Sequence, residues 1–225
     1  MMKGGKDVKL SICRLQVKSG QSVDEKQVER SISFLLDNGL CQEEAQRLRE
    51  KGNLAARVQS VGARLALLWA LSGDDRTVHD FDELPQSCEQ ASALLAALRR
   101  EQTGRPVLQG RAERISFAHC DGLAVCAINA DGEVGVDVEP LSRLLPHAQS
   151  VATRYFSEEE QALLRAAGED GYAKAFLRIW TRKEALGKRL GTGLQNQAPL
   201  LDTAVYPQER FFECEYDGCA VCVCQ

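Results

Sequence analysis

The residues best suited to chemistry lie in the segment GVDVEP, residues 135–140. If this segment is a strand, alternate side chains share a face, so Asp137 and Glu139 project together, opposite Val136 and Val138. Two carboxylates on one face repel each other unless a cation lies between them. Mg²⁺ meets this need, because it prefers oxygen ligands and takes one or two carboxylates with water and substrate phosphates. The alternative is an edge strand whose acidic side chains face water.

A second group of candidate residues lies in AFLRIWTRKEALGKRLGTGL, residues 175–194. Their spacing of i, i+4 and i+8 places Trp180, Glu184 and Lys188 along one stripe of a helix. Between residues 171 and 195 the chain has six lysines and arginines, and Glu184 is the only acid. This pattern indicates a local anion site in which one carboxylate completes the metal site and the cations hold phosphate oxygens. The alternative is a solvated basic helix face with ordinary ion pairs.

The elements that must position these residues follow from hydrophobic periodicity and turn residues. The first part of the chain reads as a strand followed by helices, expected at residues 9–17, 24–38, 42–51, 54–71 and 86–99. From Gly104 the strands RPVLQG, RISFAHC, GLAVCAI and EVGVDVE are interpreted as an antiparallel meander. Helices at 157–167 and 171–190 and the strands FFECEY and CAVCVC complete the chain. This mixture predicts an α+β fold.

Composition excludes several classes of protein. The chain has 225 residues, of which 44% are apolar and 27% charged, as in an ordinary globular protein. The formal net charge of −4 argues against a general nucleic-acid binder. The longest apolar run, Leu65 to Leu71, is far shorter than a membrane-spanning helix, and the first residues lack the apolar core of a secretory signal. We therefore expect a cytoplasmic protein with no membrane or nucleic-acid partner.

The nine cysteines are too sparse for a disulfide scaffold, so we expect reduced thiols. Cys214, Cys219, Cys222 and Cys224 lie close together near the end of the chain. A zinc site is one interpretation of this cluster, but a single pair spaced by two residues indicates it only weakly. The favoured interpretation is two short strands with small apolar thiols in the packing.

Three motifs, in their order and separation, resemble the 4′-phosphopantetheinyl transferases of the two-lobed, surfactin-synthetase type: GVDVEP, YFSEEE and WTRKEALGKRLGTGL. The resemblance covers about residues 104–194. It implies transfer of the 4′-phosphopantetheine arm of coenzyme A to a serine of an acyl or peptidyl carrier protein, which releases adenosine 3′,5′-bisphosphate. It also implies Mg²⁺ as cofactor, with Mn²⁺ as a substitute. The metal ligands it implies are Asp137, Glu139 and Glu184, with Lys188 at the phosphates and Lys183 beside them.

Upstream, the resemblance implies two contacts to the nucleotide. In GRPVL, Arg105 takes the place of a lysine near the 3′-phosphate, and in ISFAHC, His119 matches a histidine that contacts coenzyme A phosphate. Ala118 stands where the family has a serine, which removes one hydroxyl donor. Taken alone, His119 is more typical of a core or turn histidine than of a ligand, and only its position in the motif reverses this.

Glu160, in the YFSEEE motif, has two interpretations that do not exclude each other. The resemblance places it near the active site as a candidate base for the serine proton. The spacing Ser157-x-x-Glu160 is also that of a capping box at the start of a helix. Glu160, Glu184 and a metal-bound water all remain candidates to accept the proton.

The resemblance further implies two similar, pseudo-symmetric lobes, each an antiparallel sheet with packed helices, with the active site in the cleft between them. We expect an N-terminal lobe at residues 1–131, a C-terminal lobe at 132–225, and a monomer. The carrier protein would serve fatty-acid or secondary-metabolite synthesis. Two alternatives remain: a non-catalytic relative that binds coenzyme A or a carrier protein, and a different Mg²⁺-dependent enzyme such as a nucleotide pyrophosphatase.

Overall fold

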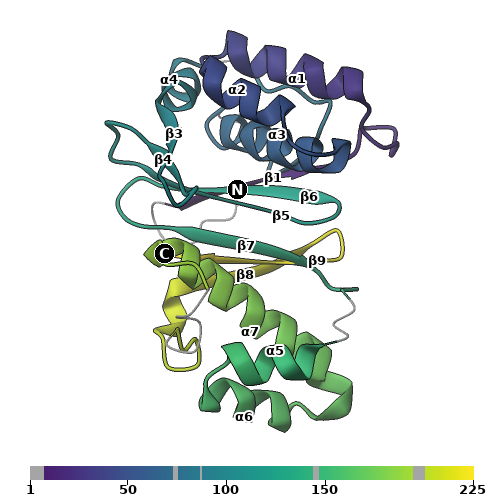
Figure 1. Ribbon diagram of the computed structural model, residues 1–225, viewed down its shortest axis with the longest axis vertical. Coiled ribbons are helices and arrows are strands. Elements are labelled where there is room, and N and C mark those ends of the chain that lie inside the picture. The colour runs from purple at the N-terminus through teal and green to yellow at the C-terminus, as the bar shows by residue number, and fades with distance from the viewer. Residues whose placement is uncertain (1–7, 73–75, 87, 144–146, 195–200) are drawn as a thin grey trace. The chain divides into compact units, whose positions relative to one another are not determined.

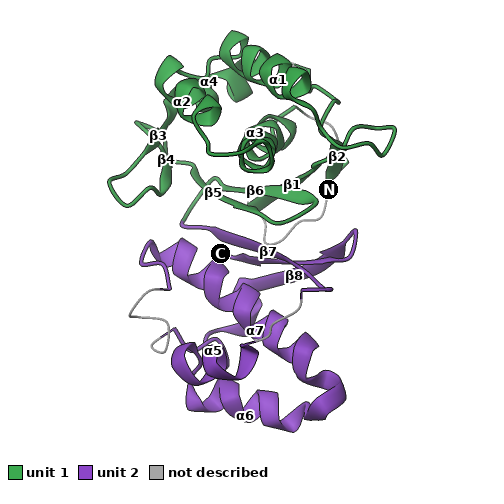
Figure 2. Cartoon of the chain, turned by 45° about the vertical axis from the view of Figure 1, so that its right-hand side comes forward, with its two compact units in different colours: residues 1–132 green, residues 133–225 purple. Residues whose placement is uncertain are grey.

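A computed structural model describes residues 8–72, 76–86, 88–143, 147–194 and 201–225. The chain divides into two compact units, Met1–Gly132 and Glu133–Gln225 (Figure 2). Both units combine helices with strands, so the predicted α+β class is confirmed. No helix of the described residues is long and apolar enough to cross a membrane.

The helices of the first unit begin where the sequence places capping residues. They are α1 (Glu25–Asp37), α2 (Gln42–Arg49), α3 (Leu54–Trp69) and α4 (Glu89–Ala97). At the start of α1 the Asp24 side chain accepts a hydrogen bond from the Gln27 backbone amide, and the Gln27 side-chain oxygen accepts one from the Asp24 backbone amide. These bonds satisfy amides that the first helical turn leaves free.

A four-stranded sheet carries the helices of the first unit. Its order is β2 (Val78–Asp80), β1 (Val8–Arg14), β6 (Leu123–Asn129) and β5 (Arg114–His119). The β1–β2 pair is parallel and the other two pairs are antiparallel. A separate two-stranded ribbon joins β3 (Leu98–Arg100) to β4 (Pro106–Leu108).

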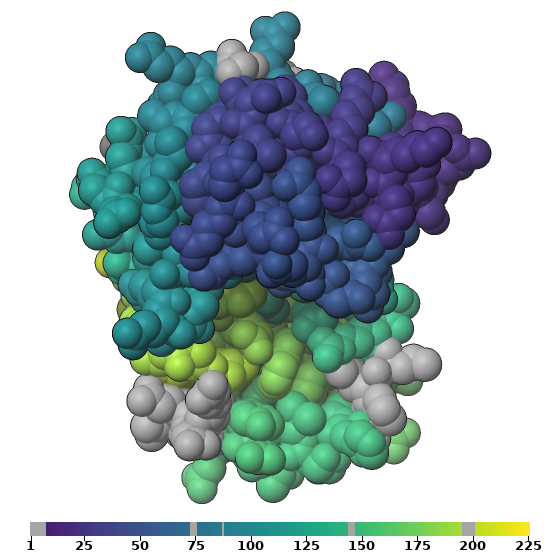
Figure 3. All heavy atoms as spheres, turned by 45° about the horizontal axis from the view of Figure 1, so that its top comes forward, coloured from purple at the N-terminus to yellow at the C-terminus, as the bar shows by residue number. Residues whose placement is uncertain are grey.

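The core of the first unit forms where α3 packs on β1 and β6. Eleven of the sixteen residues of α3 are buried, because the sheet lies on one side of the helix and α1, α2 and α4 lie on the other (Figure 1). The outer face of this helical layer, formed by α1 and α2, is visible in purple to blue in Figure 3. The nearly continuous apolar sequence of α3 follows from this two-sided burial.

The second unit is a three-stranded antiparallel sheet in the order β7 (Gly135–Pro140), β9 (Cys219–Cys224) and β8 (Phe211–Tyr216). Its helices are α5 (Ala148–Tyr155), α6 (Glu158–Ala166) and α7 (Gly168–Leu190). The long helix α7 packs on β7 and β9, and α6 packs on α7. A short 3₁₀ turn, Gln208–Arg210, leads into β8. The cysteine-rich strands β8 and β9 form as predicted, and all of their thiols are free.

The predicted meander of four successive strands is wrong. Only β5 and β6 pair as neighbours, whereas β4 pairs with β3 and β7 pairs with β9. The reason lies in β6, whose two edges are already hydrogen-bonded to β1 and β5. No edge of β6 is left for β7, which starts the sheet of the second unit instead.

Candidate active site

The candidate site is built where α7 lies against β7, and Gly135 permits this close approach. A Cβ atom on Gly135 would lie 1.8 Å from the carbonyl oxygen of Ala185 and 2.5 Å from the amide nitrogen of Arg189. Because Asp137 and Glu139 alternate with the valines of β7, they share the face of Gly135, which is the face that α7 covers. The acidic pair therefore faces the helix that carries Glu184 and Lys188.

Asp137 is the most deeply placed of the three carboxylates, with 7% of its surface exposed. Its Oδ1 accepts a hydrogen bond of 2.7 Å from the Lys188 ammonium, which also donates to the carbonyl oxygen of Val136 at 3.0 Å. Its Oδ2 is buried without a hydrogen-bond partner among the described residues. Burial raises the pKa of Asp137, and Lys188 opposes that rise. The interpretation of this strand as one whose acids face water is wrong for Asp137.

Glu139 is the second acid of β7. Its Oε1 accepts a hydrogen bond of 3.1 Å from the indole nitrogen of Trp180 and also pairs with Arg143. Trp180 and Lys188 thus contact the two acids of β7 from one stripe of α7, as the spacing predicted.

Glu184 lies between Trp180 and Lys188 on the same stripe and is half-buried. Burial raises the pKa of its carboxyl group, and Asp137 and Glu139 raise it further, while Lys188 and Arg143 act in the opposite direction. No hydrogen bond to this carboxylate is found among the described residues. Glu184 is therefore held near two other acids without a bonded partner of its own.

The donor set fits a hard divalent cation in its chemistry. It offers three carboxylates and no thiol or imidazole, and it includes the orphaned, buried Oδ2 of Asp137. Within the described residues, however, no three acidic, cysteine or histidine side chains are gathered tightly enough to hold a metal ion as they stand. Lys188 already bonds one oxygen of Asp137. Binding of a cation therefore requires these side chains to rearrange.

The cations of the basic stretch of α7, where the sequence predicts a local anion site, have bonded or charged partners within the unit. Arg178 and Arg182 both bond the carboxylate of Glu213 on β8, at 3.0 and 2.6 Å. Lys174 lies 3.8 Å from Glu215, and Arg189 donates to the Tyr206 hydroxyl at 2.8 Å. Three of the six cations of this stretch thus pair with two acids of β8.

Glu160 and Lys183 form a fully buried ion pair, each with 0% of the side chain exposed and with Nζ and Oε2 2.6 Å apart. Lys183 also donates to the carbonyl oxygen of Leu201 at 2.6 Å, and Glu160 Oε1 accepts from the amide and hydroxyl of Thr203. Glu160 Oε2 accepts from the Ser157 amide, so the predicted capping box is confirmed. Burial lowers the pKa of Lys183, whereas Glu160 raises it. Both side chains are engaged within the unit, with no surface left to meet a ligand.

The predicted nucleotide contacts lie in the first unit. Arg105 follows the turn at Gly104 and leads into β4, and its carbonyl oxygen accepts a hydrogen bond of 3.0 Å from the Glu101 amide. His119 ends β5 with an exposed side chain, whereas Ala118 beside it is 5% exposed. Neighbouring residues of a strand face opposite sides, so Ala118 points away from the face that presents His119.

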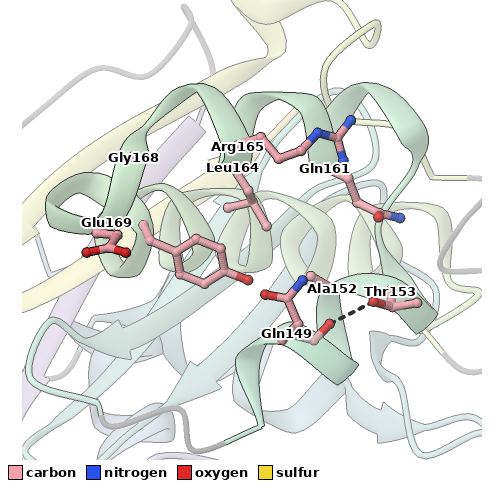
Figure 4. A pocket seen from close by; sticks show the side chains of 9 residues that line it. Gln149, Ala152, Thr153, Gln161, Leu164, Arg165, Gly168 and Glu169 are labelled. Atoms are coloured by element: carbon pink, nitrogen blue, oxygen red, sulfur yellow. Dashed lines mark hydrogen bonds between the residues drawn. The ribbon is translucent and has the colours of Figure 1, made fainter.

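A pocket in the second unit lies apart from these candidates. Its volume is about 540 Å³, and α5, α6 and the start of α7 contribute its lining (Figure 4). It is lined by Gln149, Ala152, Thr153, Gln161, Leu164, Arg165, Gly168, Glu169 and Tyr172. The Thr153 hydroxyl donates to the Gln149 carbonyl oxygen at 2.9 Å (Figure 4). None of the predicted site residues lines it.

Two residues of the site were missed by sequence reasoning. Arg143 pairs with Glu139, and its position four residues after that acid was a signal that could have found it. Glu213 pairs with two arginines of α7, but it is more than thirty residues away in sequence and meets them only through the position of β8 in the sheet. Nothing in its local sequence marks it.

Comparison with known proteins shows what the second unit is similar to. Residues 133–215 match the model of the 4′-phosphopantetheinyl transferase superfamily, so the resemblance that the motifs predicted is confirmed. This range contains the acidic strand β7, the capping box and the whole of α7.

Individual relatives carry the same name. The 4′-phosphopantetheinyl transferase HetI of Nostoc sp. is 38% identical over 98 residues, which are 42% of this chain and 41% of the relative. The 4′-phosphopantetheinyl transferase AcpT of Salmonella typhimurium is 30% identical over 124 residues, 55% of this chain and 64% of the relative. The 4′-phosphopantetheinyl transferase gsp of Aneurinibacillus migulanus is 28% identical over 96 residues, 43% of this chain and 38% of the relative. The matches thus span about half the length of these relatives.

Proposed function

We propose that this chain is a 4′-phosphopantetheinyl transferase of the cytoplasm. It transfers the phosphopantetheine arm of coenzyme A to a serine of an acyl or peptidyl carrier protein and releases adenosine 3′,5′-bisphosphate. The observation that carries the proposal is the stripe Trp180, Glu184 and Lys188 of α7 facing Asp137 and Glu139 of β7. The comparisons support it, because this arrangement falls inside the matched region.

Asp137, Glu139 and Glu184 would hold Mg²⁺, or Mn²⁺ in its place. Bound there, such an ion would offset the negative charge on the oxygens of the transferred phosphoryl group. The orphaned Oδ2 of Asp137 supports this role, since a buried carboxylate oxygen without a partner is costly unless a ligand satisfies it.

Lys188 would stabilise the leaving group. The carrier serine oxygen attacks the β-phosphorus, the bond from this phosphorus to the bridging oxygen breaks, and adenosine bisphosphate departs with the electron pair. The bond of the Lys188 ammonium to Asp137 supports this role, because it keeps a cation beside the proposed metal ligands, where it would offset the charge on that departing oxygen.

Glu184 is the better candidate to accept the serine proton. Glu160 has both oxygens bonded, to Lys183, Ser157 and Thr203, and is fully buried. Glu184 is half-buried with a raised pKa, which favours proton uptake at neutral pH. We assign Glu160 and Lys183 to holding the fold of the second unit.

Incubation with coenzyme A, Mg²⁺ and a panel of apo carrier proteins tests the proposal. We expect the carrier to gain the mass of one phosphopantetheine arm. Binding of coenzyme A without a mass gain on any carrier would indicate a non-catalytic binding relative. Cleavage of coenzyme A without a change of the carrier would indicate a nucleotide pyrophosphatase.

Removal of divalent cations provides the second test. We expect chelation to stop transfer and added Mg²⁺ to restore it, because an all-carboxylate donor set prefers hard cations. Restoration by zinc but not by Mg²⁺ would contradict the assignment of Asp137, Glu139 and Glu184 as ligands.

A further inference from the structure

A buried carboxylate in the first unit holds two arginines together. Glu44 lies on α2 with 5% of its surface exposed. Its Oε1 accepts hydrogen bonds from Arg64 of α3 and, at 3.2 Å, from Arg100 of β3. One oxygen atom thus connects a core helix to the ribbon formed by β3 and β4.

Arg64 connects this carboxylate to β5. Its guanidinium lies 5.0 Å from the centre of the Phe117 ring and donates to the Ser60 carbonyl oxygen at 2.9 Å. Phe117 and His119 lie two residues apart on β5 and so project from the same face of the sheet. The position of Arg64 therefore constrains the end of β5 that carries His119.

Arg100 connects the same carboxylate to the turn before Arg105. It donates to the carbonyl oxygen of Gly104 at 2.8 Å, and this carbonyl belongs to the peptide bond that leads into Arg105. The turn is closed by hydrogen bonds between Glu101 and Gly104 and between Glu101 and Arg105. Arg100 thereby fixes the backbone from which Arg105 projects.

Positive charge outnumbers negative charge around Glu44. Burial alone would raise the pKa of Glu44, but Arg64 and Arg100 hold it below its ordinary value, so this carboxyl group stays ionised. Burial lowers the pKa of Lys51, and the nearby charges of Arg100 and Arg64 lower it further. Three cations thus surround one carboxylate, and without Glu44 nothing in this group would offset their repulsion.

We propose that Glu44 is a positioning residue for coenzyme A. Through Arg100 and Arg64 it holds the Arg105 turn and the His119 end of β5 in the geometry that binds the 3′-phosphate. This inference rests on the proposed function and adds a residue to it that touches neither the nucleotide nor the reacting atoms.

The test compares coenzyme A with dephospho-coenzyme A, which lacks the 3′-phosphate. Calorimetry on the full chain gives the two dissociation constants for wild type, Glu44→Gln and the control Glu43→Gln. Glutamine keeps the shape of Glu44 but removes its charge, so we expect Glu44→Gln to lose about tenfold or more in affinity for coenzyme A. Its affinity for dephospho-coenzyme A should change by less than about twofold.

Glu43→Gln is the matched control, because Glu43 is adjacent in sequence but forms an exposed pair with Arg47. We expect it to behave as wild type. If Glu44→Gln fails to fold, Arg100→Lys decides the question, since Arg100 is on a more exposed ribbon and bonds Gly104 and Glu44 through two separate guanidinium nitrogens, which the single nitrogen of lysine does not reproduce. We expect the same selective loss from that variant.

The outcomes separate the inference from the function on which it rests. Equal losses for both ligands, or an unchanged preference in Glu44→Gln and Arg100→Lys, would overturn the positioning role while leaving the transferase intact. A wild-type chain that binds neither ligand would overturn the proposed function and this inference with it.

Discussion

At the scale of single residues, burial acts in the same direction on two carboxyl groups of the candidate site. It raises the pKa of Asp137 and of Glu184, Glu139 raises both further, and Asp137 also raises that of Glu184. Lys188 reduces the cost of burying the charged Asp137 carboxylate through a direct bond. Glu184 has no such bond among the described residues, so it is the carboxylate that gains most from a bound cation.

Replacing Glu184 by glutamine should abolish transfer and leave the fold intact. The change removes a proposed metal ligand and proton acceptor but keeps the volume of the side chain. Turnover and thermal unfolding should be measured together, with Glu169→Gln at the exposed start of the same helix as control. Activity within about tenfold of wild type, which is about 1.4 kcal/mol in the barrier, would show that Glu184 does not carry the chemistry.

At the scale of elements, α7 presents two consecutive residues to opposite surroundings. Lys183 is locked to Glu160 and Leu201 in the core of the unit, and Glu184 faces the acids of β7. The buried pair thus fixes the rotation of α7 about its axis, and this rotation sets where Glu184 and Lys188 point. Breaking the Glu160–Lys183 pair should therefore displace Glu184 relative to Asp137 and Glu139, although neither member of the pair contacts these carboxylates.

Gly135→Ala tests the contact of α7 with β7. The added Cβ would lie 1.8 Å from the Ala185 carbonyl oxygen, so the helix or the strand must move. We expect a loss of about 1–3 kcal/mol in unfolding free energy together with a loss of transfer. Gly52→Ala is the control, since a Cβ there meets nothing within 4 Å. Equal stability of the two variants in denaturant would contradict the close approach.

Glu213 predicts how the stability of the second unit depends on pH. Burial raises its pKa, but hydrogen bonds from Arg182 and Arg178 outweigh this and hold it below the ordinary value of 4.5. A lowered carboxyl pKa stabilises the folded state above the unfolded value, and this contribution disappears as the pH falls from about 4.5 through the folded pKa.

Wild type should therefore lose more stability than Glu213→Gln between neutral pH and about pH 3, by no more than about 1 kcal/mol, because the pair is partly exposed. Denaturant unfolding at several pH values measures the difference. Parallel curves for the two proteins would show that these ion pairs contribute nothing to stability.

The sequence predicted which segments form helices and strands better than it predicted which strands pair with one another. The strand with alternating valines, the capping box of Ser157 and Glu160, and the stripe of α7 depend on local spacing, and all three formed. Strand pairing depends on which edges are free, so the meander could not be recognised as wrong before β6 was seen between β1 and β5. The pairing of Glu213 with the arginines of α7 and that of Glu44 with Arg64 and Arg100 depend on such distant contacts, too.

At the scale of the whole molecule, the residues proposed for the 3′-phosphate and those proposed for the metal belong to different units. Arg105 and His119 lie in the first, whereas Asp137, Glu139, Glu184 and Lys188 lie in the second. Substitutions in the two sets should therefore affect different measured properties. The first should govern recognition of the 3′-phosphate, and the second should govern metal dependence.

Arg105→Ala should reduce affinity for coenzyme A and leave affinity for dephospho-coenzyme A nearly unchanged, because only the first has a phosphate for this side chain. Each charge-assisted hydrogen bond to a phosphate is worth about 1.5–3 kcal/mol, so a loss of about tenfold or more is expected. The Mg²⁺ concentration that gives half-maximal activity should stay the same. Equal losses for both ligands would place Arg105 away from the 3′-phosphate.

The reactivity of the free cysteines can show when each unit unfolds. Cys13 and Cys126 are fully buried in the first unit, and Cys222 and Cys224 in the second. Burial raises the pKa of all four thiols, that of Cys224 to about 11, so in the folded chain they are both shielded and protonated. Alkylating reagents attack the thiolate, which makes these positions reactive only when the surrounding unit opens. Mass spectrometry of peptides labelled in increasing denaturant would therefore follow the unfolding of each unit separately, in the unmodified wild-type chain.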